Sequence, residues 1–204
     1  MKVLLLNGSP REEGCTYTAL AEVADALNAC SVETEIIHVA TGPVHGCTAC
    51  LGCRSRDGCV FEDDKVNEVR AKMRGADGLV VGAPVYYAAP NGAMLSFLNR
   101  MFYAGTADFQ HKPGAAIVSA RRAGTTASLD VLNKYFLISN MPVVPSLYWA
   151  MVHGNTPDEV HRDGEGMQIM RALGRNMAWM IKCFAGEEKP PKAEPERIRT
   201  NFIR

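Results

Sequence analysis

Residues 2–18 constrain the fold of this chain more than any other stretch. An apolar run at residues 3–6 ends at Asn7 and Gly8, which is typical of a strand buried on both faces. From Thr16 to Asn28, apolar side chains recur at helical spacing. The chain therefore begins with a strand, a loop and a helix, the unit from which parallel sheets covered by helices are built.

The loop of this first unit is rich in groups that bind anions. Ser9, Thr16 and Thr18 carry hydroxyls, Arg11 carries a fork of donors, and Gly14 lets the backbone turn tightly. The N-terminus of the following helix adds unpaired N–H groups and a partial positive charge. These groups predict a site for a terminal phosphate. An ordinary turn with Thr16 as the N-cap is the alternative, and it leaves Arg11 and the extra hydroxyls without a role.

The same loop lacks two common nucleotide-binding motifs. It has neither a Gly-x-Gly-x-x-Gly fingerprint nor a Gly-Lys-Ser/Thr ending, which argues against a classical dinucleotide domain and against an NTPase. Its pattern, Ser-Pro-Arg-x-x-Gly-x-Thr, resembles the loop of the NAD(P)H-dependent FMN reductases, a branch of the flavodoxin-like proteins. The resemblance implies that this loop cradles the phosphate of FMN, with Cys15 standing where most members have asparagine. The implied residues are Ser9, Arg11, Gly14, Cys15 and Thr16.

The rest of the chain alternates between strand and helix patterns. Strands are predicted at residues 32–39, 78–82, 115–119 and 142–147, and helices at 63–74, 91–103, 125–139 and 166–184. The fold class is therefore α/β, a flavodoxin-like, doubly wound, five-stranded parallel sheet of order 2-1-3-4-5 with helices on both faces. The loops after the first, third and fourth strands then meet at one edge of the sheet, where ligands bind. We expect one domain over residues 1–186, with a cysteine-rich insertion at 46–59 and a polar tail at 187–204.

Two further loops carry groups that suit a flavin ring. In the first, residues 83–90, two prolines and two tyrosines also resemble the reductase family, although the tyrosines could instead cap the core. In the second, two adjacent arginines could lie near the flavin, meet a phosphate of NADPH or remain solvated. The segment from Phe97 to Arg100 resembles a helix ending of the same family, with Asn99 in place of the more frequent aspartate. The candidate flavin-binding residues are Pro84, Val85, Tyr86, Tyr87, Ser119, Arg121, Arg122 and Gly124.

Four of the seven cysteines follow the pattern C-x2-C-x2-C-x5-C. Glycines stand beside them, so the backbone can fold tightly around a centre. Three thiolates at two-residue gaps, with a fourth close behind, resemble the loops that hold cubane clusters, whereas a structural zinc site more often splits into two distant pairs. These predicted metal ligands are Cys47, Cys50, Cys53 and Cys59.

The predicted fold and the cysteine run together resemble the iron-sulfur flavoprotein family over roughly residues 1–185. This resemblance implies FMN and one [4Fe-4S] cluster per subunit. It also implies a homo-oligomer, a homodimer or a homotetramer. Zinc, a redox-active set of thiols, or a cluster lost on exposure to air remain open alternatives for the cysteines.

Composition narrows the choice of partners. Among 204 residues, 22 Lys and Arg are balanced by 22 Asp and Glu, which gives no support to nucleic-acid binding. No apolar run approaches membrane-spanning length. We therefore expect a cytoplasmic location and no membrane partner. An odd number of cysteines, clustered in a reducing compartment, favours metal or redox chemistry over disulfides.

These observations lead to three hypotheses. The first is an FMN-dependent oxidoreductase that transfers electrons, with the cluster as its one-electron port and no side chain acting as general acid or base. Its implied partners are NAD(P)H, ferredoxin-like proteins and small acceptors such as quinones. The second is an NAD(P)H-dependent FMN or quinone reductase without a cluster. The third is a non-catalytic binding domain clipped by zinc, which predicts a colourless protein.

Overall fold

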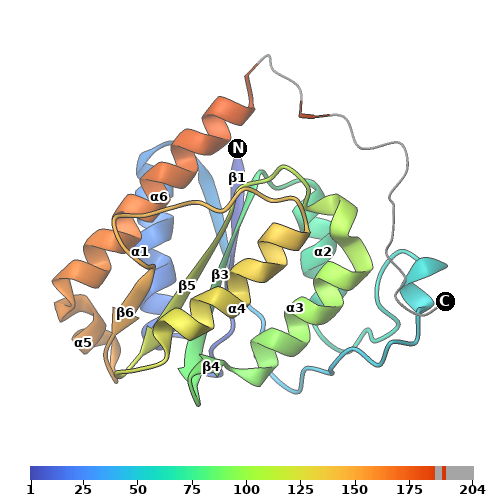
Figure 1. Cartoon of the computed structure of the whole chain (residues 1–204), viewed down its shortest axis with the longest axis horizontal. Helices are drawn as coiled ribbons and strands as arrows, with labels where there is room; N and C mark the ends of the chain where they lie inside the picture. Colours follow the sequence, from blue (N-terminus) through green and yellow to red (C-terminus); the bar gives the residue numbers. More distant parts are fainter. Residues whose placement is uncertain (187–189, 192–204) are drawn as a thin grey trace, which may run out of the picture.

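Strands and helices alternate along the chain in the computed structural model, which describes residues 1–186 and 190–191 (Figure 1). The parallel strands are β1 (Lys2–Asn7), β2 (Glu33–His38), β3 (Gly78–Tyr86), β5 (Gly114–Ala120) and β6 (Met151–His153). A short β4 (Ala89–Pro90) pairs antiparallel with β3. The parallel strands lie in the order β2-β1-β3-β5-β6, which confirms the predicted order and the flavodoxin-like fold class.

Helices cover both faces of the sheet (Figure 1). They are α1 (Cys15–Ala29), α2 (Val66–Arg74), α3 (Gly92–Gly105), α4 (Thr125–Ile138), α5 (Pro157–Arg162) and α6 (Gly164–Phe184), with short 3-10 turns at η1 (Gly52–Arg54) and η2 (Thr106–Asp108). Side chains alternate across a strand, so β1 sends Val3 and Leu5 toward α1 and α6, and Leu4 and Leu6 toward α2, α3 and α4. All four are fully buried, which explains the continuous apolar run.

The fifth parallel strand is not where the sequence placed it. Residues 142–147 pair with the sheet only through an isolated bridge between Val143 and Gly114. Pro142 and Pro145 lack the N–H groups that a regular ladder requires. The edge strand is β6, which pairs with residues 118–120 of β5.

The predicted loop at residues 83–90 is a hairpin. β3 continues to Tyr86, and the chain returns as β4 through Tyr87 and Ala88, whose φ angles are 51° and 60°. Two consecutive positive φ values are the signature of a tight turn that matches the twist of the paired strands. Neither residue is glycine, asparagine or aspartate, so the usual sequence signal for such a turn is missing.

Among the described residues, no helix combines the length and apolar character that crossing a bilayer requires. The predicted tail at residues 187–204 lies outside the described residues, apart from Pro190 and Pro191. The short helix α5 has no counterpart in the sequence-based prediction. It begins with Pro157 directly after Thr156, whose hydroxyl accepts a hydrogen bond from the Glu159 N–H.

Candidate functional site

The loops after β1, β3 and β5 meet at the carboxyl edge of the sheet, as predicted. The Gly8 N–H donates to the Gly82 carbonyl at 2.9 Å, and the buried Asn91 side chain donates to the Gly8 carbonyl at 2.7 Å. The hydroxyls of Thr16 and Ser119 share a hydrogen bond of 2.8 Å. Each contact joins the first unit of the chain to one of the other two loops.

The loop after β1 leaves the start of α1 open to an anion. The N-cap is Gly14 rather than Thr16, and no side chain caps the first turn. The N–H groups of that turn therefore have no intrahelical partner. Arg11 is exposed beside them, and its backbone N–H donates to the Ser9 hydroxyl at 3.1 Å. The Thr18 hydroxyl instead bonds the Gly14 carbonyl within its own helix, so it does not contribute to the loop.

The loop after β5 lies tightly against the hairpin. Gly124 has a φ of 93°, and a Cβ at this position would lie 2.5 Å from the Cα of Ala88. Tyr87 is fully exposed and Tyr86 is half-exposed, so neither ring fills the core as the alternative hypothesis required. The remaining candidates on these two loops are half-buried Pro84 and Val85, and exposed Arg121 and Arg122.

We predict that Gly124→Ala will lower the free energy of unfolding by about 1–3 kcal/mol, because it combines a left-handed backbone with a steric clash. The measurement is a denaturant titration of the variant and the parent protein. Gly92→Ala is the matched control, since a Cβ there meets nothing within 4 Å. Equal stability of Gly124→Ala and the parent would contradict the close approach of the two loops.

The four clustered cysteines line one small pocket between the cysteine-rich segment and α3. Cys47 and Cys50 are exposed, and Cys53 and Cys59 are half-buried. Positive φ angles at Ala49, Leu51 and Gly58 fold the segment back on itself. Within the described residues, no three His, Cys, Asp or Glu side chains are gathered tightly enough to hold a single metal ion. The four thiols thus share one pocket, but no three of them converge on one point.

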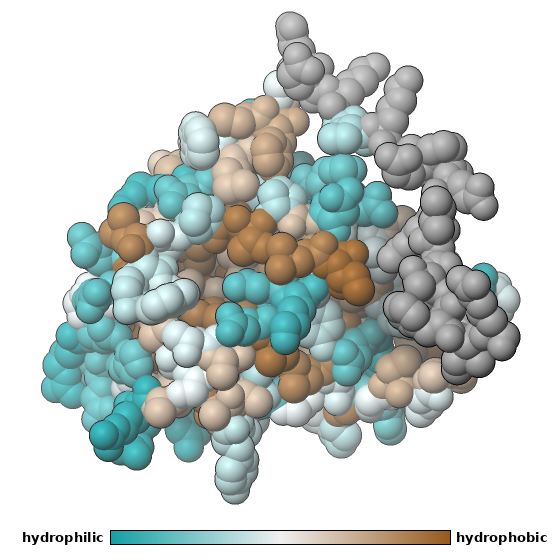
Figure 2. Space-filling model, in the orientation of Figure 1, coloured by the Kyte–Doolittle hydropathy of each residue, from teal (hydrophilic) through white to brown (hydrophobic). Residues whose placement is uncertain are grey.

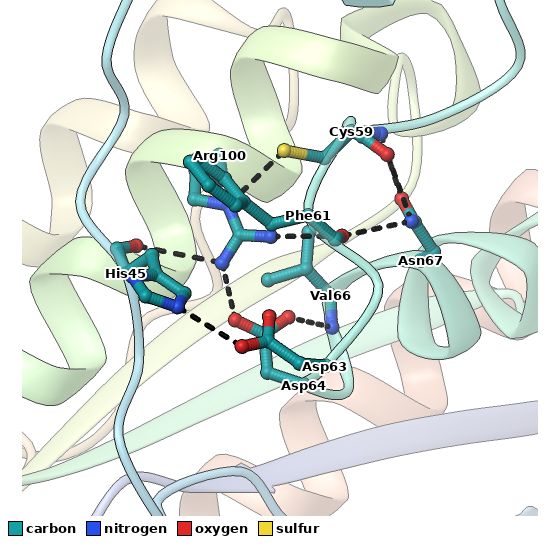
Figure 3. A network of polar contacts seen from close by, with 8 residues as sticks. All are labelled: His45, Cys59, Phe61, Asp63, Asp64, Val66, Asn67 and Arg100. Atoms are coloured by element: carbon teal, nitrogen blue, oxygen red, sulfur yellow. Dashed lines mark hydrogen bonds and ion pairs between the residues drawn. The ribbon is translucent and has the colours of Figure 1, made fainter.

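A buried arginine on α3 ties this segment to the fold (Figure 3). Arg100 is 2% exposed, and its guanidinium donates to Cys59 Sγ at 3.1 Å, to the Phe61 carbonyl at 3.1 Å and to the Asp64 carboxylate. It also lies over the Phe61 ring, 5.0 Å from the centroid. Burial alone lowers the pKa of Arg100, but the hydrogen bonds with Asp64 and Cys59 outweigh that effect and raise it. Arg100 is therefore a permanent positive charge beside a cysteine sulfur.

Sequence reasoning identified Arg100 only as part of a helix ending. The missed signal is its position on the buried stripe of α3, three residues after Phe97 and one before Met101. A charged residue on such a stripe is rarely buried without a partner. His45, two residues before Cys47, directs its ring toward Asp63 at 3.0 Å, and its backbone carbonyl accepts a hydrogen bond from Arg100 at 3.4 Å.

Cys15 is the first residue of α1 and is half-buried, with its sulfur 3.6 Å from the Gly154 carbonyl. Burial raises the pKa of its thiol, against smaller opposing effects from a backbone hydrogen bond and the charge of Arg11. We predict that iodoacetamide near neutral pH will alkylate Cys15 more slowly than exposed Cys183, because less of its thiol is ionised and access is poorer. Peptide mapping by mass spectrometry measures both rates, and equal rates would contradict the prediction.

The fold and the three convergent loops define a flavodoxin-like α/β protein. The sequence profile of the family described as NADPH-dependent FMN reductase matches residues 1–156, and the chain belongs to this family. It is accordingly a flavin-dependent oxidoreductase. This membership gives no support to the hypothesis of a non-catalytic, zinc-clipped domain.

Curated relatives confirm the expected resemblance to iron-sulfur flavoproteins. The protein of that name from Methanocaldococcus jannaschii is 31% identical over 193 residues, covering 90% of this chain and 99% of the relative. The iron-sulfur flavoprotein of Methanosarcina thermophila is 27% identical over 189 residues, covering 90% and 97%. An NADPH azoreductase from a Bacillus species is 26% identical over 133 residues, covering 65% of each chain.

Solved structures agree on the fold. RosB with a bound 8-demethyl-8-formylriboflavin-5'-phosphate intermediate has a TM-score of 0.71 at 14% identity, covering 100% of this chain and 96% of its own. An NADH:FMN oxidoreductase in its apo form has a TM-score of 0.63 at 18% identity, covering 91% of each. The assignment of individual residues to a flavin or a metal stays a prediction.

Proposed function

We propose that this protein is an FMN-dependent electron-transfer oxidoreductase that holds a [4Fe-4S] cluster on Cys47, Cys50, Cys53 and Cys59. FMN supplies two-electron exchange with a nicotinamide donor and one-electron exchange with the cluster. The observation that carries the proposal is that all four clustered cysteines line one pocket.

The residues at the sheet edge fit the phosphate of FMN. The first turn of α1 has no side-chain cap, so its N–H groups remain available to an anion. Arg11 is exposed beside that turn, and the Thr16 hydroxyl lies at the junction with β5 through its bond to Ser119. We propose that Ser9, Arg11, Gly14, Cys15 and Thr16 hold the phosphate.

The hairpin and the loop after β5 suit the flavin ring. Exposed tyrosine rings offer flat apolar faces, and the close packing at Gly124 fixes the two loops relative to each other. The adjacent arginines place positive charge where it would stabilise a reduced, anionic ring. The residues proposed for this role are Pro84, Val85, Tyr86, Tyr87, Ser119, Arg121, Arg122 and Gly124.

The residues of the cysteine pocket match the ligand set of a cluster in kind and number. Four thiolates are the ligand set of a cubane cluster. The charge of Arg100 offsets part of the negative charge that four thiolates would bring together.

A cluster-free NAD(P)H-dependent FMN or quinone reductase is the second candidate. It is favoured by the similarity to an NADPH azoreductase and by the exposure of Cys47 and Cys50. Under either function we propose NAD(P)H, ferredoxin-like proteins or quinones as electron partners.

We also propose a homodimer or a homotetramer. Figure 2 shows apolar side chains in a band across the face that carries α4 and the segment after it, where Leu137, Ile138 and Leu147 are exposed. An exposed apolar band of this kind is typical of a subunit interface. Sedimentation of the purified protein measures the assembly state.

The deciding experiment is anaerobic purification followed by an absorption spectrum and assays for FMN, iron and sulfide. We expect one FMN per chain, with about four iron and four sulfide as the cluster type requires. FMN without iron or sulfide would favour the cluster-free reductase. Protein that lacks flavin and does not take up added FMN would contradict both candidates.

A further inference from the structure

Arg100 is the only charged side chain among the described residues that line the cysteine pocket. Its Nε lies 3.1 Å from Cys59 Sγ, which is a short distance for a donor and a sulfur acceptor (Figure 3). The side chains of Arg100 and Asp64 are 1% and 6% exposed, so solvent screens neither. A buried, charge-assisted hydrogen bond thus ends on one of the four proposed ligands.

The other donors of Arg100 already hold the segment in place. One terminal nitrogen contacts the Asp64 carboxylate and the His45 carbonyl, and the other donates to the Phe61 carbonyl. These bonds fix the guanidinium plane, so the direction of the Nε–H toward sulfur is set by the fold. The same network places one compensating negative charge, Asp64, on the side of the guanidinium away from Cys59 (Figure 3).

We propose that Arg100 and Asp64 act in opposite directions on the reduction potential of the cluster, Arg100 through its bond to Cys59 and Asp64 by compensating the arginine charge. The proposal rests on the proposed [4Fe-4S] function. One-electron reduction adds negative charge to the ligand sulfurs, and a donated hydrogen bond with a nearby positive charge stabilises that charge. Arg100 therefore raises the potential, and Asp64 lowers it. Both are positioning residues, since neither supplies a ligand.

The test compares the reduction potentials of three variants with that of the parent protein, by redox titration monitored by electron paramagnetic resonance. Arg100→Gln should shift the potential to a more negative value. Arg100→Lys should shift it less in the same direction, because it keeps the charge but loses the fixed Nε–H. Asp64→Asn should shift it to a more positive value, and it keeps an oxygen able to accept from the Val66 N–H.

The matched control is Arg56→Gln, which removes an exposed arginine of the same segment that pairs with Glu62. It should leave the potential unchanged. A merely structural role would change iron content or thermal stability in Arg100→Gln and Asp64→Asn alike, without shifts of opposite sign. Shifts of the same sign, or no shift in either variant, would overturn the proposal.

Two further outcomes separate this proposal from the function on which it rests. If Arg100→Gln does not retain iron, the comparison of Asp64→Asn with Arg56→Gln still decides, because only the former should raise the potential. If the parent protein carries FMN but neither iron nor sulfide, the proposed function and this proposal fail together. If the parent protein carries the cluster and the reduction potentials of the variants equal that of the parent, this proposal alone fails.

Discussion

Cys53→Ser should abolish iron binding while FMN stays in place. Cys53 is half-buried in the pocket and is the third of the four proposed ligands, so its loss leaves the cluster with an incomplete ligand set. Loss of a residue that only supports a ligand typically weakens metal affinity 10–100-fold, so removal of a ligand should lower iron and sulfide content at least about tenfold. The proposed FMN site lies on other loops and should not change.

Assays for iron, sulfide and flavin on anaerobically purified protein measure this effect. Cys183→Ser is the matched control, because Cys183 is exposed on α6, outside the cysteine-rich segment. It should keep full iron content. Full iron content in Cys53→Ser would show that the pocket is not the cluster site. The cluster-free reductase would then be the better-supported function.

Asn91→Ala should weaken FMN binding about tenfold and lower the free energy of unfolding by about 1–3 kcal/mol. Asn91 is the N-cap of α3, but its side chain does not cap that helix and instead donates to the Gly8 carbonyl at 2.7 Å. The substitution removes this bond, so the buried Gly8 carbonyl at the base of the proposed phosphate loop loses a hydrogen-bond donor. The loop should then lose part of its attachment to the start of α3, and with it the position that it gives to the N-terminus of α1.

Isothermal titration of the flavin-free protein with FMN, together with a denaturant titration, measures both quantities. The control is Asn176→Ala, which removes a bond of the same kind to the Pro145 carbonyl at 2.9 Å, at an exposed position. We expect little change in either quantity for the control. Unaltered FMN affinity in Asn91→Ala would contradict the proposal that Asn91 supports the phosphate loop.

Most of the fold could be predicted because its strands carry local signals. Residues 3–6, 78–82 and 115–119 are short apolar runs bounded by turns, and each is a strand in the structure. β6 was missed because it has three residues and follows a more apolar segment that proline excludes from regular pairing. The hairpin was missed because Tyr87 and Ala88 adopt positive φ values without the residues that usually mark them.

In the candidate site, too, the parts with local sequence signals could be predicted and the long-range contacts could not. The cysteine spacing and the phosphate loop are continuous motifs, so sequence alone was enough to propose them. The contact between Arg100 and Cys59 joins positions 41 residues apart, and nothing local to either residue predicts it. The contact between Asn91 and Gly8 spans 83 residues and depends on the sheet order. Such long-range pairs emerge only from the tertiary fold.

Helix α3 begins beside Asn91 at the first loop and carries Arg100 into the cysteine pocket. Nine residues of α-helix rise about 14 Å, and each added residue turns the helix by about 100°. Side-chain hydrogen bonds anchor α3 at two positions, Asn91 at the N-cap and Arg100 in the second half, so the turns between them act as a rigid spacer with a fixed twist. Inserting or deleting a single residue between the anchors would swing one of them out of place. Under the proposed function, this stretch of α3 would therefore set the spacing between the phosphate loop and the cysteine pocket.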